Sequence, residues 1–119
     1  ARSFIGLTNL CDFVSVALSH PAAVGETFLA ADSVPVSTPA LLQAIGEALG
    51  RSAHVLPLPV GLLRMAAFAV GGQREFRRLT GSLELDAGKA ARQLGWRPPR
   101  AFGAELADTV EAWRQRSAA

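Results

Sequence analysis

Arginine is the residue type of this chain best suited to bind a ligand. The 119 residues contain eleven arginines and one lysine, and Arg74, Arg77 and Arg78 are spaced so that a helix would present all three on one face. A guanidinium matches the oxygens of a phosphate with its planar fork of donors. Three like charges on one face also repel one another unless an anion lies among them. The spacing therefore predicts a phosphate-binding face, with a solvated basic surface beside Glu75 as the alternative.

Residues that carry out acid–base, metal or thiol chemistry are scarce. The chain has no tyrosine, one lysine, two histidines and a single cysteine, Cys11. His20 precedes a proline and His54 lies in an apolar segment, so both are expected to be structural or solvated. One thiol and no CxxC motif exclude a structural zinc site and a disulfide scaffold, which favours a reducing, cytoplasmic location. We predict no catalytic residue and no metal ligand in this chain.

Length and composition predict one folded domain over residues 1–119. Half of the residues are apolar, 18% are charged and the mean hydropathy is +0.24, which excludes a disordered tail. We expect neither a signal peptide nor a membrane span, because no apolar stretch approaches the ~20 residues that a span needs. The net charge of only +2 is weak evidence for a nucleic-acid partner. The expected partners therefore include neither nucleic acid nor membrane.

Three short apolar segments have the pattern of buried strands: residues 3–7, 27–31 and 54–58. Helical segments alternate with them, which is typical of parallel strands joined by right-handed crossovers. We therefore predict an α/β fold with a small, mostly parallel sheet of about three short strands and five or so helices. A parallel sheet needs cover on both faces, so another chain or a further part of the same polypeptide is expected to complete it. The start of the chain almost directly on a strand favours the second option.

Capping signals bound the predicted helices. Asn9 and Asp12 are expected to cap a helix over residues 10–19, and Thr38, followed by a proline, to cap one that ends at residue 50. Gly95 is placed to end a helix in the left-handed conformation, with Trp96 packing back onto that helix. Further helices are expected at residues 60–70, 73–79, 87–94 and from about residue 104.

The helix predicted at residues 60–70 is apolar almost all round. Such a helix is buried or lies at an interface. Residues 62–70 are therefore expected to belong to the core, or to dock a missing part of the protein, rather than to bind lipid. In the helix that follows, Phe76 and Leu79 are expected to face inward. Apolar surface left exposed here would suit self-association into a homo-oligomer.

Three stretches together resemble a known family. They read RSFIGLTNL at residues 2–10, RLTGSLELD at residues 78–86 and KAARQLGWRPP at residues 89–99. In this order and spacing they are similar to the C-terminal part of extended short-chain dehydrogenase/reductases. The matching branch is the NAD-dependent nucleotide-sugar epimerase/dehydratase family, typified by UDP-glucose 4-epimerase. The resemblance covers essentially the whole chain.

The resemblance implies a chain that binds substrate without performing the chemistry. In that family an N-terminal Rossmann half holds NAD on a glycine-rich turn and supplies the catalytic Ser, Tyr and Lys, while the C-terminal lobe closes over the nucleotide-sugar. This chain contains neither GxGxxG nor YxxxK. It is therefore expected to be a substrate-binding lobe that lacks its Rossmann half, binds no NAD itself and is inactive alone. The expected ligand is a nucleotide-sugar, in the first place a UDP-sugar.

The resemblance also assigns substrate-binding residues. Arg2 stands at the arginine of the family's R-x-F-[IV]-x-V motif, and Arg78 best matches the family's second arginine; both arginines contact the substrate diphosphate. Arg77, Ser82 and Asn9 are further candidate contacts. Ser82 and Asn9 stand where the family has acidic residues, so the contacts that those acids make are not implied here. Without the resemblance, Arg2 would be read as a frayed terminal residue.

An alternative function needs no ligand. A stand-alone interaction or dimerisation module would use an exposed sheet edge and the helix at residues 62–70 for self-association, without catalytic activity. The sugar, the nucleotide base and the choice between epimerisation, dehydration and reduction stay open, because they depend on residues outside this chain.

Overall fold

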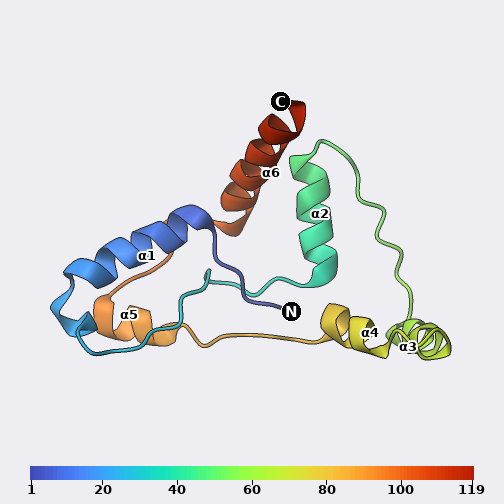
Figure 1. The fold of residues 1–119 in the computed structure, drawn as a ribbon, viewed down its shortest axis with the longest axis horizontal. Helices are drawn as coiled ribbons and strands as arrows, with labels where there is room; N and C mark the ends of the chain where they lie inside the picture. The colour runs from blue at the N-terminus through green and yellow to red at the C-terminus, as the bar shows by residue number, and fades with distance from the viewer.

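The computed structural model describes all 119 residues and consists of helices joined by long irregular segments (Figure 1). The molecule measures 54 × 35 × 23 Å along its principal axes. In chain order the elements are α1 (Leu7–Ser19), the short 3₁₀-helix η1 (Pro21–Ala23), α2 (Thr38–Ala48), α3 (Val60–Ala69), α4 (Gln73–Thr80), α5 (Gly88–Leu94) and α6 (Phe102–Ala118). α1 and α5 lie at one end, α2 stands beside α6, and α3 with α4 forms the other end (Figure 1).

The predicted parallel sheet is absent, so the α/β assignment is wrong. Helix accounts for 58% of the residues and strand for 3%, in the form of two isolated bridges at Arg2. Residues 27–31 and 54–58 lie outside the helices but form no ladder with each other. In the second segment the N–H groups of Val55 and Leu58 donate to carbonyls only two residues back. A short apolar run favours extended backbone, but it does not specify the partner that would make it a strand.

Short backbone pairing instead joins three distant segments near the start of the chain. On one side the Arg2 N–H donates to the Val36 carbonyl at 2.9 Å, and the Val36 N–H donates back at 2.8 Å. On the other side the Ser3 N–H donates to the Leu83 carbonyl, and the Leu83 N–H to the Ala1 carbonyl, both at 3.0 Å. Arg2 is therefore held between the segment before α2 and the segment after α4.

The core is small and lies where α1 meets α5. Its buried residues are Ala90, Leu94 and Trp96, and partly buried side chains of α1 pack against them. The Trp96 ring meets that of Phe13 edge-on, with centroids 5.0 Å apart. The Trp96 indole N–H donates to the Asp12 carboxylate at 2.8 Å. Asp12, predicted to cap α1, instead anchors the tryptophan.

The end of α5 confirms the prediction made from the sequence. Gly95 follows the helix with φ 65° and ψ 15°. Its N–H donates to the Ala91 carbonyl, and the Trp96 N–H donates to the Ala90 carbonyl. The left-handed residue turns the chain, so that Trp96 packs back onto the helix that it follows.

α2 packs along α6, and a side chain of α6 helps to complete the hydrogen bonding of α2 (Figure 1). α2 begins at Thr38, one residue earlier than predicted, and its cap is Ser37 instead of Thr38; the Ser37 hydroxyl accepts from the Ala40 N–H at 3.3 Å. Arg114 of α6 donates to the Leu49 carbonyl at 2.6 Å. This contact satisfies one of the carbonyls that a helix leaves free at its C-terminus.

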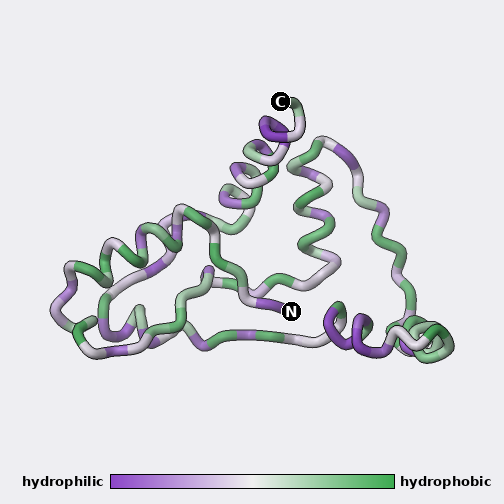
Figure 2. Tube along the Cα trace, viewed as in Figure 1, coloured by the Kyte–Doolittle hydropathy of each residue, from purple (hydrophilic) through white to green (hydrophobic).

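α3 and α4 form a separate arm, here called the α3–α4 arm (residues 60–80), whose helices pack mainly on each other. None of the residues of α3 is buried, so of the two predicted roles for residues 62–70 the one in the core is wrong, and the one in docking a missing part stays a prediction. Leu79, predicted to face inward, is exposed, whereas Phe76 is half-buried. Figure 2 shows α3 as largely hydrophobic and α4 as largely hydrophilic. No helix of the chain is both long enough and apolar enough to cross a membrane.

The open arrangement leaves much apolar surface uncovered. The Cα radius of gyration is 17.7 Å, whereas a compact domain of this length has one of about 13.5 Å. Only nine of the 119 residues are buried, so the chain gains little of the stabilisation that apolar burial provides.

Replacing Gly95 with alanine is expected to lower the free energy of unfolding by about 1 kcal/mol. A Cβ at this position would meet no atom within 4 Å, so the cost comes from the left-handed backbone alone. Gly103, exposed in the first turn of α6 and without a positive φ, is the matched control. Gly103→Ala is expected to raise the free energy of unfolding by up to about 1 kcal/mol. Urea denaturation followed by circular dichroism measures both, and changes of the same sign would contradict the prediction.

Candidate phosphate-binding site

The three arginines of α4 share one exposed face, as their spacing predicts. The ion pairs of the structure lie elsewhere, and no carboxylate oxygen comes within 4.0 Å of Arg74, Arg77 or Arg78. Together with Gln73 they line an open cavity of about 410 Å³. Like charges at this spacing destabilise a helix unless a counter-charge is supplied. The face is therefore suited to an anion that accepts several hydrogen bonds, such as a phosphate.

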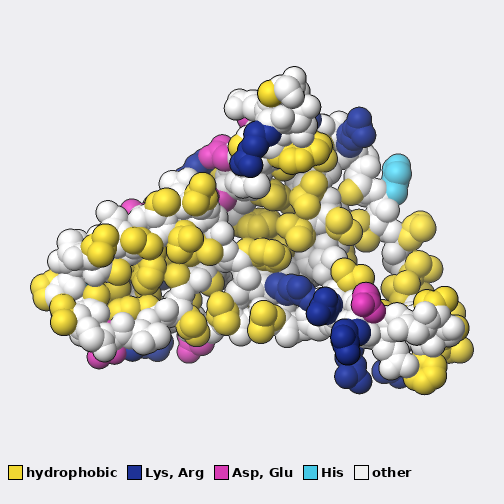
Figure 3. All heavy atoms as spheres, in the orientation of Figure 1, with side chains coloured by type: hydrophobic (Ala, Val, Ile, Leu, Met, Phe, Trp, Pro, Cys, Tyr) yellow, Lys and Arg dark blue, Asp and Glu magenta, His cyan; other side chains and the backbone are white.

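Backbone contacts bring Arg2 to the end of α4. The Thr38 hydroxyl donates to the Leu79 carbonyl at 3.1 Å and so ties the last turn of α4 to the start of α2. Two residues beyond α4 the chain reaches Ser82 and then Leu83, which bridges to Arg2. Figure 3 shows Lys and Arg side chains gathered where the N-terminal segment meets α4. The two arginines assigned from the resemblance, Arg2 and Arg78, therefore belong to one region of the surface.

The remaining candidate contacts fall in two different places. Arg77 lies on the same face of α4 as Arg78, and Ser82 lies beside Arg2. The Ser82 hydroxyl accepts a hydrogen bond from the Ala1 nitrogen at 3.0 Å. Asn9 lies apart from these residues, in the buried interior.

Asn9 is wholly buried, with 0% of its surface exposed. Its amide nitrogen donates to the Asp32 carboxylate at 2.7 Å and to the Arg100 carbonyl at 2.9 Å, and its oxygen accepts from the Arg100 N–H at 3.0 Å. The predicted capping role is wrong, because α1 begins at Leu7 with Gly6 as its N-cap. The structure gives Asn9 a scaffolding role and gives no support to a contact with substrate.

Two carboxylates from distant parts of the chain cap the start of α1. The Gly6 N–H donates to Asp32 at 3.2 Å, and the Thr8 N–H donates to Glu105 at 3.1 Å. They satisfy donors that a helix leaves free at its N-terminus, and their negative charge suits the positive end of the helix dipole. Both carboxylates are buried. These two caps could not be predicted from the sequence, because the rules for helix capping consider only residues close to the helix in the chain.

Arg100 supplies the positive charge of this region. Its guanidinium lies 3.4 Å from the Glu105 oxygen that has no hydrogen-bond partner, and it also pairs with Asp108 on the next turn of α6. The hydrogen bond to Asp108 raises the pKa of Arg100 above its ordinary value, so the guanidinium stays charged. Asn9, Asp32, Arg100 and Glu105 are called the buried polar cluster below.

The start of α1 does not fit the pyrophosphate of NAD. A dinucleotide site offers repeated glycines and free backbone N–H groups at a helix N-terminus. Here the N–H groups of Gly6 and Thr8 already bind carboxylates. A Cβ on Gly6 would overlap the Glu105 side chain, so this glycine makes room for a carboxylate. The turn therefore lacks the donor set that a pyrophosphate needs, and its charge is of the wrong sign.

Comparison with known proteins relates the chain to an epimerase. Over 114 residues, 96% of the chain, it is 30% identical to UDP-glucose 4-epimerase of Vibrio cholerae. The match covers 35% of that protein, so the chain spans about a third of the length of this relative. No family model matches the chain, and no solved structure does so either. The similarity confirms the resemblance at the level of an epimerase-related region.

Replacing Asn9 with alanine is expected to lower the free energy of unfolding by about 2–3 kcal/mol, because Asp32 and the Arg100 backbone lose buried hydrogen-bond partners. Gln115→Ala is the control, since Gln115 is exposed and bonds only to Glu111 on its own helix; its effect is expected to stay within about 0.5 kcal/mol. Urea denaturation measures both variants. Equal stability of the two would show that the hydrogen bonds of Asn9 contribute nothing to stability.

Proposed function

We propose that this chain binds the diphosphate of a nucleotide-sugar, in the first place a UDP-sugar, through Arg2 and Arg78. The observation that carries the proposal is the group of arginines on α4 without acidic partners, next to the backbone that bears Arg2. The similarity to UDP-glucose 4-epimerase over 96% of the chain supports a nucleotide-sugar as the class of ligand.

The chemistry of a diphosphate suits this surface. A diphosphate spreads its negative charge over several oxygens, and each guanidinium can bind two of them with parallel hydrogen bonds. Arg2 and Arg78 approach from different segments, so they can take different phosphates of one ligand. Arg77 offers a third group of donors on the same face of α4. A bound diphosphate would also relieve the repulsion among these arginines.

The proposed role is binding, and the reaction is assigned elsewhere. The chain has no tyrosine and a single lysine, and its residues at the start of α1 do not fit a pyrophosphate. Hydride transfer in the parent protein, an NAD-dependent epimerase or dehydratase of the cytoplasm, would belong to a Rossmann half that holds NAD and the catalytic Tyr and Lys. This chain alone is expected to be inactive.

The exposed apolar surface of the α3–α4 arm favours a second candidate function, self-association without a ligand. Leu62, Met65 and Phe68 of α3 are all largely exposed. A self-association module would form a dimer whose amount depends on protein concentration and does not respond to nucleotides. Analytical ultracentrifugation with and without UDP-glucose separates the two functions.

Arg2→Ala and Arg78→Ala are each expected to weaken the binding of UDP-glucose at least tenfold, because each removes charged hydrogen bonds to the diphosphate. Isothermal titration calorimetry at constant ionic strength measures the affinities. Arg116→Ala is the matched control, since Arg116 lies in the last turn of α6 and its loss changes the net charge equally.

Two outcomes would contradict the assignment. UDP-glucose affinity that is unchanged in both variants would show that the diphosphate does not lie on Arg2 and Arg78. A loss of the same size in Arg116→Ala would show a general effect of net charge rather than a site.

A further inference from the structure

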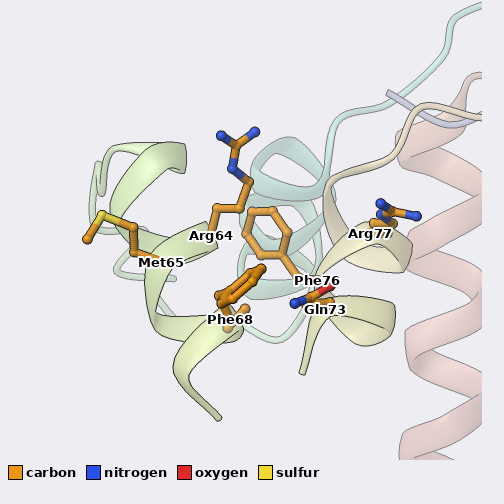
Figure 4. A pocket seen from close by; sticks show the side chains of 7 residues that line it. Arg64, Met65, Phe68, Gln73, Phe76 and Arg77 are labelled. Carbon is orange, nitrogen blue, oxygen red and sulfur yellow. The ribbon is translucent and has the colours of Figure 1, made fainter. Parts of the chain in front are cut away.

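A cavity of about 610 Å³ lies between α3 and α4, next to the arginine face (Figure 4). Phe68 of α3 and Phe76 of α4 line it, and both rings project into the space between the two helices, with Gln73 beside them (Figure 4). Its volume falls within the range of small-molecule sites, which is roughly 300–1,000 Å³.

The two phenylalanine rings lack aromatic partners. The ring pairs of the structure are all formed by other residues. Phe68 is 71% exposed, although it is a large apolar side chain, and Phe76 is half-buried. Aromatic faces left open in this way suit a flat ring that stacks on them, as the bases of nucleotides do.

The cavity is continuous with the phosphate-binding face. Gln73 and Arg77 line both the 610 Å³ cavity and the 410 Å³ cavity that holds Arg74 and Arg78. One ligand with a flat ring at one end and phosphates at the other would therefore reach both. A purely apolar ligand would leave the arginines uncompensated, and inorganic phosphate would leave the rings exposed.

We infer that the α3–α4 cavity receives the base of the nucleotide whose diphosphate lies on Arg2 and Arg78, with Arg77 between the base and the diphosphate. This inference rests on the proposed function and adds where the base lies. Phe68 and Phe76 supply apolar faces for the ring. The Gln73 amide, with one acceptor and two donors, is placed to bond to the polar edge of the base.

Comparison of UDP with pyrophosphate tests the position of the base, because the two share the phosphates and differ in the nucleoside. Isothermal titration calorimetry is carried out on the whole chain and on Phe68→Ala. The variant is expected to bind UDP at least fivefold more weakly and to bind pyrophosphate with unchanged affinity. Leu62→Ala is the matched control, because Leu62 is an exposed apolar residue of α3 outside the cavity; it should leave both affinities unchanged.

Phe68→Trp is a second variant that distinguishes the loss of an aromatic face from misfolding of the chain. It keeps a large aromatic face at the same position, so UDP affinity is expected to stay within twofold of the original chain. Circular dichroism of each variant records the helix content.

The outcomes separate this inference from the proposed function. Binding of pyrophosphate with no tighter binding of UDP would overturn the position of the base and leave the phosphate site standing. Equal losses for UDP and pyrophosphate in Phe68→Ala would also overturn it, since the ring would then support α4 rather than the base. Failure of the original chain to bind either ligand would overturn both.

Discussion

The capping of α1 by carboxylates from distant parts of the chain is the interaction on which the rest of the structure depends. Asp32 and Glu105 bind backbone N–H groups at the start of the helix, and Asn9 links Asp32 to the backbone of Arg100. In a chain with nine buried residues, three of them, Asn9, Asp32 and Glu105, belong to this cluster. Its hydrogen bonds from Thr8 to Glu105 and between Asn9 and Arg100 join segments more than 90 residues apart.

The cluster also positions the candidate phosphate site. Residues 2–6 run directly from Arg2 into the capped end of α1, and the Asp32 N–H donates to the Phe4 carbonyl at 2.7 Å. Pairing with Val36 and Leu83 then fixes Arg2 beside the chain that leaves α4. A buried scaffold and an exposed anion site are thus connected through five residues of backbone. Asn9 therefore belongs to the buried scaffold, although it lies only seven residues after Arg2 in the same sequence motif.

Local features of this chain could be predicted from the sequence, and long-range pairing could not. The helix at Thr38, the left-handed Gly95 and the arginine face of α4 each follow from residues within a few positions, and the structure has all three. The predicted sheet is absent, because an apolar run in the sequence does not specify the segment with which it pairs. The predicted cap of α1 by Asn9 and Asp12 was wrong for a similar reason, since the carboxylates that cap this helix lie far from it in the sequence. The exposure of α3 also depends on which other segments pack on it, and the sequence of α3 alone does not determine those segments.

The central claim is that a nucleotide diphosphate lies on the arginines of α4 and on Arg2. The most direct measurement follows the side-chain Nε–Hε resonances of all eleven arginines by NMR while UDP-glucose is added. The account predicts saturable shifts for Arg2, Arg77 and Arg78, with Arg114 and Arg116 unmoved. Shifts spread evenly over all arginines, or none at Arg2 and Arg78 under saturating ligand, would contradict it.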